Sequence, residues 1–198
     1  MALESNFDRR LFVVGDELVT GIGDRKGLGW LGRVVSRTQL TPPALVFPLA
    51  VANEDTGQLR ERWVTEVTSR LSPNPEANHK LIVALGKADL DAGITLSRSR
   101  LNLANILDTA SEHRISSLVV GPPPVDLRLR RDLGELSQAF EEVSYRRAIP
   151  FIDTFNPLVE NEQWREDLAA SGGPFPGQVG YGLLAWLVLN TGWKTWID

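Results

Sequence analysis

The chain has 198 residues, of which 42% are hydrophobic and 23% are charged, and its formal net charge is −4 at pH 7. This length and balance fit one globular domain over residues 1–198, and the acidic charge without long Lys or Arg runs argues against nucleic acid as a partner. The absence of cysteine excludes disulfides, thiolate metal sites and a cysteine nucleophile.

The sequence also argues against a membrane partner. The first ten residues, MALESNFDRR, are polar, and no stretch reaches the roughly 18 apolar residues of a membrane span. We therefore expect a cytoplasmic protein. The short basic run RLRR at 128–131 is expected to be the solvated start of a helix.

Short apolar runs alternate with longer amphipathic stretches along the chain. The runs are rich in Val, Ile, Leu and Phe without clean alternation, which indicates strands buried on both faces, and the stretch 56–71 carries apolar residues at helical spacing. The alternation predicts a five-stranded parallel sheet with helices on both faces. In chain order, strand first, the segments are 11–15, 27–38, 44–51, 56–71, 81–86, 99–114, 117–121, 129–148, 150–153 and 177–189.

Functional side chains are expected just after the strands, because open parallel sheets bind ligands outside the carboxyl ends of their strands. The segments at these positions are GDE, ANEDTG, GKADLD and GPPPV after the first four strands. After the fifth strand, residues 154–178 are expected to form a long functional loop that enters the last helix.

Four stretches together resemble a known family. VVGDELVTGIGD resembles a strand followed by Gly-Asp-Ser-Leu, and FPLAVANEDTGQLRERW resembles a strand and a loop carrying a Gly. ALGKADL resembles Gly-x-Asn-Asp, and GGPFPGQVGYGLLA resembles Asp-x-x-His-Pro followed by Gly-Tyr. The chain is similar in these stretches, which span nearly its whole length, to the SGNH or GDSL hydrolases, a family of lipases and esterases. The resemblance implies a three-layer α/β/α flavodoxin-like sandwich.

The resemblance also implies which positions carried the family's chemistry. The family uses a Ser nucleophile, a Gly N–H and an Asn side chain for the oxyanion, and a His base oriented by an Asp. In the same order, the corresponding positions in this chain are Glu17, Asn53, Ala88, Phe175 and Gly172. Since none holds the family's residue, the resemblance implies an esterase-like pseudoenzyme without serine-hydrolase activity, retained for binding, regulation or assembly.

Glu17 leaves a second interpretation open. A carboxylate serves as a nucleophile or base in other enzymes, so the chain could be an active hydrolase of an ester or carbohydrate ester, using Glu17 with Asp16, Asp89 or Glu54. If Glu17 begins a helix, the helix dipole stabilises its charge and makes it a weak base. Glu17 would then either cap its own helix as an internal plug or line a binding pocket.

The predicted pocket residues surround Glu17. Asp16 and Asp89 are expected to tie the turns structurally, Asn53 to bond local backbone, and Lys87 is a possible partner of Glu17. We expect no metal and no cofactor, because the acids lack regular ligand spacing. The full predicted set is Asp16, Glu17, Asn53, Lys87, Asp89 and Phe175.

The histidines lie away from this site. His79 and His113 each precede a strand, which puts them at the amino edge of the sheet. Neither is therefore expected to replace the missing base.

The tryptophans concern the core and assembly. Trp30, Trp63 and Trp186 fall on apolar helix faces and are expected in the core. Trp193 and Trp196 follow the last helix and either pack back onto the domain or form a homodimer patch, since bulky aromatics anchor interfaces. The partner of the chain, a small molecule or a protein, stays unidentified at this point.

Overall fold

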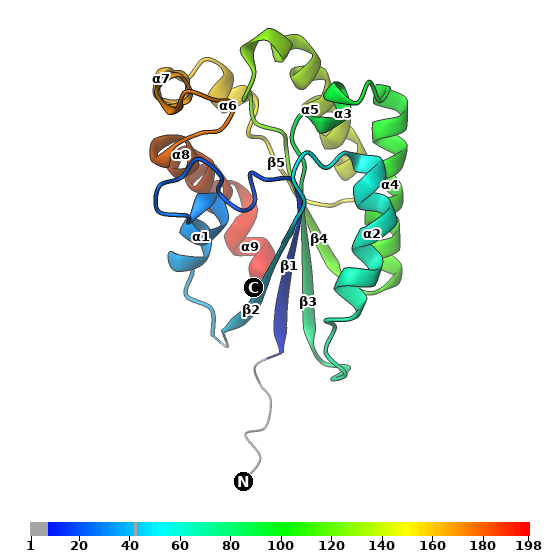
Figure 1. Cartoon of the computed structure of the whole chain (residues 1–198). Coiled ribbons are helices and arrows are strands. Elements are labelled where there is room, and N and C mark those ends of the chain that lie inside the picture. Colours follow the sequence, from blue (N-terminus) through cyan, green and yellow to red (C-terminus); the bar gives the residue numbers. More distant parts are fainter. Residues whose placement is uncertain (1–7, 42) are drawn as a thin grey trace.

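The computed structural model describes residues 8–41 and 43–198. At its centre lies a parallel sheet with the strand order β2-β1-β3-β4-β5, the flavodoxin-like order, which confirms the predicted fold class (Figure 1). Residues 1–7 of the predicted polar N-terminus lie outside the described residues. The strands are β1 (Arg9–Gly15), β2 (Ala44–Ala50), β3 (Asn78–Ala84), β4 (Ser116–Val120) and β5 (Phe151–Ile152).

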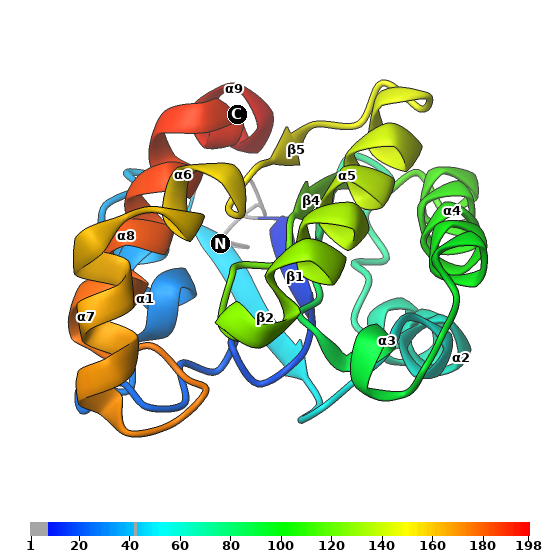
Figure 2. The ribbon, with the colours of Figure 1, turned by 90° about the horizontal axis from the view of Figure 1, so that it is seen from above.

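Helices cover both faces of the sheet, as Figure 2 shows from above. On one face lie α1 (Gly29–Ser36), α8 (Gln178–Val188) and α9 (Lys194–Ile197), and on the other lie α2 (Thr56–Thr68), α4 (Leu96–Glu112) and α5 (Arg130–Tyr145). The shorter α3 (Ala88–Asp91), α6 (Asn156–Val159), α7 (Glu162–Ser171) and the 3₁₀ turn η1 (Leu127–Leu129) lie in the segments that follow the strands. In the part of the chain that the structure describes, no helix is long and apolar enough to cross a membrane.

The central strands are buried on both sides, which explains their unbroken apolar sequence. Leu11 and Val13 of β1 belong to the core cluster under α1 and α8, while Phe12 and Val14 belong to the cluster under α2, α4 and α5. Successive side chains of a strand point to opposite faces, so both sets must be apolar. β2 is an edge strand, which is why it tolerates Pro48 within it.

The segment 154–178 differs from the expected long loop because it contains α6 and α7. Asn161 caps α7 by accepting the Trp164 N–H at 3.0 Å, and Trp164 and Leu168 are buried one helical turn apart. The helix ends at Gly172, whose φ of 71° lies in the left-handed region. The fifth strand is also shorter than predicted, with two paired residues in place of four.

The tryptophans are only partly where the sequence places them. Trp30 and Trp63 are in the core as predicted, but Trp186 is 59% exposed, so its placement in the core was wrong. A kink at Thr191 and Gly192, within η2 (Leu189–Trp193), brings the end of the chain back onto the domain, and Trp193 and Trp196 are buried. The Trp193 indole N–H donates to Thr38 Oγ1 at 2.8 Å. Of the two predicted alternatives, packing back onto the domain is the one observed. The alternative of a homodimer patch made of these two side chains is therefore wrong.

The burial of Trp193 generates a stability prediction. Trp193→Ala removes a fully buried ring and its hydrogen bond, so we expect the free energy of unfolding to fall by about 3–5 kcal/mol in urea titrations. The exposed Trp186→Ala is the matched control, with an expected change of about 0.5 kcal/mol or less. Equal losses in the two variants would contradict the observed packing.

Candidate functional site

The carboxyl ends of the first three strands lie at one level. Gly15 pairs in register with Ala50 of β2 and with Ala84 of β3. Val51 N–H donates to the Gly15 carbonyl at 2.9 Å, and Asp16 N–H donates to the Ala84 carbonyl at 3.3 Å. The loops that carry the predicted site residues therefore start side by side at the carboxyl ends of the strands. This end of the sheet is called its carboxyl edge below.

Glu17 and Asn53 meet across this edge. The Asn53 backbone N–H donates to Glu17 Oε2 at 2.6 Å, although the two residues are 36 positions apart. Asn53 has a φ of 54°, in the left-handed region that glycine adopts freely and that asparagine tolerates best among other residues. Glu17 is half-buried and Asn53 is exposed. The Glu17 side chain, in the turn after β1, is thus hydrogen-bonded to the backbone N–H of Asn53, in the loop after β2.

Glu17 does not begin a helix, so the condition under which a helix dipole would stabilise its charge is not met. A series of i→i+3 backbone hydrogen bonds follows Asp16, and Gly21 and Gly23 then adopt φ values of 76° and 87°, which no helix accommodates. The first helix starts only at Gly29. Glu17 therefore accepts a hydrogen bond from the amide of a neighbouring loop instead of capping its own helix.

The turn after β1 is held by Asp24, a residue that the sequence analysis missed. Its buried carboxylate accepts the N–H groups of Lys26, Leu28 and Gly29 at 3.0 to 3.1 Å and forms an ion pair with Arg33. The Arg33 hydrogen bond, followed by the backbone bonds, lowers the pKa of Asp24 to about 2. The available signal was an Asp directly before a glycine-rich stretch, where Asp side chains commonly bond the backbone of a turn.

Asp16 ties the same turn from inside the protein. Its Oδ1 accepts the Leu18 N–H at 3.0 Å, and its other oxygen lies against Gly86, where any Cβ would collide with it. Burial, and after it the charge of Glu17, raises the pKa of Asp16 to about 7. The expected structural tie is therefore present, with a carboxyl group that is half-protonated near neutral pH.

Asp89 and Lys87 have partners of their own. The buried Asp89 carboxylate accepts the Thr56 N–H at 2.7 Å and the Thr56 hydroxyl at 2.9 Å, which ties the loop after β3 to the start of α2. Lys87 Nζ pairs with Asp91 one helical turn later. Lys87 is therefore paired with Asp91 and not with Glu17, its possible partner in the sequence analysis.

Glu54, a candidate partner of Glu17 in the alternative hydrolase, is also occupied. Its buried carboxylate forms an ion pair with Arg62, with Nη2 and Oε2 2.6 Å apart. Burial raises the pKa of Glu54 above its ordinary value despite the opposing effect of Arg62. This pair anchors the loop after β2 to α2.

The remaining positions of the resemblance lie near the same edge. Ala88 is buried at the start of α3, and Phe175 is half-buried against the core cluster that contains Leu18 and Tyr181. The Phe175 side chain lies beside Gly23 of the turn after β1. These positions therefore present a methyl group and a ring to their surroundings.

Both histidines lie at the opposite end of the sheet. His79 is the second residue of β3, and its Nε2 accepts the Ser72 N–H at 3.0 Å. His113 follows α4 directly and is exposed. Their predicted place at the amino edge is confirmed.

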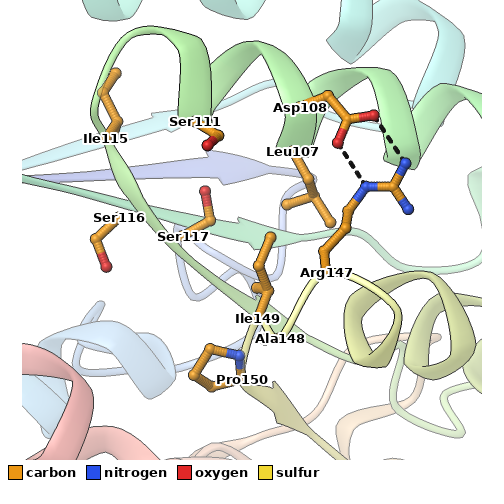
Figure 3. Close-up of a pocket in the computed structure, with 10 residues that line it drawn as sticks. All are labelled: Leu107, Asp108, Ser111, Ile115, Ser116, Ser117, Arg147, Ala148, Ile149 and Pro150. Atoms are coloured by element: carbon orange, nitrogen blue, oxygen red, sulfur yellow. Dashed lines mark hydrogen bonds and ion pairs between the residues drawn. The ribbon is translucent and has the colours of Figure 1, made fainter.

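Two hollows lie on the surface, one beside the candidate site and one at the other end of the sheet. The first, with a volume of 530 Å³, lies between α7 and the loops after β3 and β4. Its lining includes Lys87 and Pro174, which directly precede Ala88 and Phe175 in the sequence. The second, of 330 Å³, lies at the amino end of β4, where Ser111 and Ser117 face each other (Figure 3). None of the predicted site residues lines the second hollow.

We find no metal centre in the described ranges, because no group of three or more His, Asp or Glu side chains there is arranged to hold an ion.

The raised pKa of Asp16 predicts a pH dependence of stability. Because its pKa in the folded protein, about 7, lies above the ordinary 3.8, ionising Asp16 disfavours the folded state progressively as the pH rises from about 4 to 7. Asp16→Asn removes this ionisation. Between pH 4 and 8, the wild type should lose on the order of 4 kcal/mol of unfolding free energy relative to Asp16→Asn. The exposed Asp132→Asn is the control, and a wild-type slope in Asp16→Asn urea titrations would contradict the prediction.

Solved structures that resemble this chain include a lipase/acylhydrolase and two esterases. A lipase/acylhydrolase from Enterococcus faecalis is 22% identical, with 94% of this chain and 96% of that chain covered and a TM-score of 0.73. The acetylxylan esterase Axe2 from Geobacillus stearothermophilus is 14% identical, with coverages of 92% and 93% and a TM-score of 0.70. The psychrotrophic esterase EstA from Pseudoalteromonas sp. is 14% identical, with coverages of 96% and 99% and a TM-score of 0.65. At these identities the likeness establishes the fold.

The family is established by sequence. No curated protein matches the chain. Residues 13–183, which run from β1 into α8 and include every loop at the carboxyl edge, match the GDSL-like Lipase/Acylhydrolase family. The chain belongs to this family.

Proposed function

We propose that this GDSL-family protein is a pseudoenzyme that does not hydrolyse esters by serine catalysis and uses its carboxyl-edge site for binding. The observation that carries the proposal is the hydrogen bond from the Asn53 N–H to the Glu17 carboxylate. By the resemblance, Glu17 stands at the nucleophile position and Asn53 at the position of a glycine that donates to the oxyanion. The left-handed φ of Asn53 supports that assignment, because such a position favours glycine.

This hydrogen bond opposes acyl transfer in two ways. An oxyanion hole needs free N–H groups aimed at the developing negative charge. Here the Asn53 N–H is already bonded to a carboxylate oxygen, which would also repel an oxyanion placed beside it. The side chain at the nucleophile position therefore takes the place of the charge that the hole would stabilise.

The other assigned positions lack the remaining groups. The side chain of Ala88 has no amide to donate, the side chain of Phe175 has no atom that accepts a proton, and Gly172 has no carboxylate to orient a base. In a serine hydrolase, loss of the nucleophile or base alone reduces turnover by on the order of a millionfold. Serine-type turnover is therefore expected to be absent.

A carboxylate-based hydrolase is the second candidate. The pKa of Asp16, about 7, lies in the range of an efficient general base, which favours this candidate. The geometry opposes it, because the Asp16 carboxyl is buried against Leu18 and Gly86. Glu54 is bound by Arg62 and Asp89 by Thr56.

The first test measures turnover by the unmodified protein. We expect the wild type to hydrolyse p-nitrophenyl acetate and butyrate no faster than buffer does, and a serine-directed fluorophosphonate to leave the peptide containing Glu17 unlabelled. Glu17→Gln separates the two candidates. Hydrolysis by the wild type that Glu17→Gln abolishes would refute the pseudoenzyme and establish the carboxylate mechanism.

The second test restores the family's residues. The variant Glu17→Ser, Ala88→Asn, Gly172→Asp, Phe175→His should gain esterase activity at least about tenfold above its control and react with the fluorophosphonate at residue 17. The control carries the same three changes with Glu17→Ala. Because Gly172 has a φ of 71°, its change to Asp strains the end of α7, so both variants are first checked for cooperative thermal unfolding. Equal turnover in two folded variants would contradict the assigned positions.

A further inference from the structure

The hollow at the amino end of β4 has the features of a binding site for a small molecule. Its volume of 330 Å³ lies within the range of about 300–1,000 Å³ that is typical of ligand pockets. Its walls come from α4, from the first residues of β4 and from the segment 147–150, which joins α5 to β5 (Figure 3). None of the residues that carry the proposed function lines it, so an inference about this hollow stands independently of that function.

A buried hydroxyl group without a partner lies in this hollow. Ser117 is 7% exposed, and its buried Oγ forms no hydrogen bond with any residue that the structure describes. Figure 3 shows the Ser117 hydroxyl pointing toward Ser111 across the hollow. Most buried polar groups of native proteins have a hydrogen-bond partner, because a bond left unmade is costly. The Ser117 hydroxyl is therefore a group whose hydrogen bond a bound molecule would supply.

The end of the strand ladder leaves room beside Ser117. β5 pairs with β4 only from Phe151 onward, and Phe151 lies opposite Val119. Pro150, directly before β5, has no N–H with which to continue the ladder. Ala148 has a φ of 53°, in the left-handed region, which takes the chain out of the extended conformation of a strand. The hollow therefore lies where a longer β5 would have covered Ser117.

The charged side chains of the hollow are paired with each other. Arg147 Nε and Nη2 donate to the two carboxylate oxygens of Asp108 at 2.7 and 2.8 Å (Figure 3). This bidentate pair joins α4 to the segment after α5 and gives each charge its partner. A charged ligand would lose part of its hydration here without meeting an unpaired opposite charge. The hollow therefore favours a neutral ligand.

The other side chains combine a pair of hydroxyls with apolar walls. The exposed Ser111 places a second hydroxyl opposite Ser117, and each hydroxyl both donates and accepts hydrogen bonds. Leu107 is buried behind them, Ile149 is half-buried and Pro150 is exposed. An apolar group that covers these carbon atoms loses its contact with water, which favours binding. A molecule with an apolar body and a head group that donates and accepts fits this combination.

We propose that the hollow binds a small neutral carboxamide, with the amide group on Ser117 and Ser111 and the apolar body against Ile149 and Pro150. The amide carbonyl accepts from one hydroxyl and the amide N–H donates to the other, so one head group serves both. Because Ser111 is exposed, its side chain is free to rotate and admit the head group to the Ser117 hydroxyl. A carboxylate of the same shape lacks the N–H donors and adds a charge.

NMR titration of the full chain tests the proposal. Benzamide should shift the backbone amide signals of Ser111, Ser117 and Ile149 with a Kd on the order of 1 mM, as expected for so small a ligand. Benzoate, which has the same shape and a negative charge, should bind at least about tenfold more weakly. Ser117→Ala should weaken benzamide binding at least about threefold, because one hydrogen bond is lost. The control Ser69→Ala removes an exposed hydroxyl at the end of α2 and should keep the wild-type affinity.

Stability separates a binding role of Ser117 from a structural one. Since its hydroxyl has no partner among the described residues, Ser117→Ala should leave the urea midpoint of the ligand-free protein unchanged or raise it. A lower midpoint would show that the hydroxyl is already bonded within the protein and would overturn the proposal. Absence of benzamide shifts at the three amides, equal affinity for benzamide and benzoate, or unchanged benzamide affinity in Ser117→Ala would each overturn it as well.

Discussion

The hydrogen bond between the Asn53 amide and the Glu17 carboxylate depends on the parallel register of β1 and β2. Because Gly15 and Ala50 are level, a side chain two residues beyond Gly15 reaches the loop that follows Ala50. The bond gives a partner to the backbone N–H of Asn53, whose φ of 54° is in the left-handed region. It also places the negative charge of Glu17 at the carboxyl ends of the strands, where ligands of such sheets bind. The register of β1 and β2 therefore makes possible the contact on which the proposed loss of serine catalysis rests.

The other loops at this edge are anchored by acids that each have a separate partner. Asp24 is held by Arg33 and three backbone N–H groups, Glu54 by Arg62, and Asp89 by Thr56. A buried carboxylate without such a partner would lower the free energy of unfolding, because its charge would be removed from water without compensation. These partners therefore hold the loops in their observed shape.

The sequence was sufficient to predict the strands and the long helices, because their patterns reflect burial. The run around Val13 is apolar on both faces of the sheet, and Leu59, Trp63 and Val67 of α2 are buried at helical spacing as predicted. The resemblance to the family then predicted a candidate site at the carboxyl ends of the strands, where Glu17 and Asn53 are in contact. These features depend on residues close together in the chain or on a repeated pattern.

The features that escaped prediction depend on geometry between distant or competing groups. Trp186 lies on the apolar helix α8 but points to solvent. Because nearly all residues of this helix are apolar, the sequence pattern does not show which face is exposed. Lys87 pairs with Asp91, four residues later, because side chains at this spacing lie close together on a helical turn. The contact between Glu17 and Asn53 joins loops 36 residues apart and could not be read from either loop alone.

Hydrogen exchange of the Asn53 amide, followed by NMR in the wild type and in Glu17→Ala, tests the central claim most directly. If the Glu17 carboxylate occupies this donor, the amide of the exposed Asn53 exchanges slowly in the wild type and at least about tenfold faster in the variant, while the neighbouring Val51 amide, bonded to Gly15, is unchanged. Equally fast exchange of the Asn53 amide in both proteins would show that the donor is free and would contradict the account.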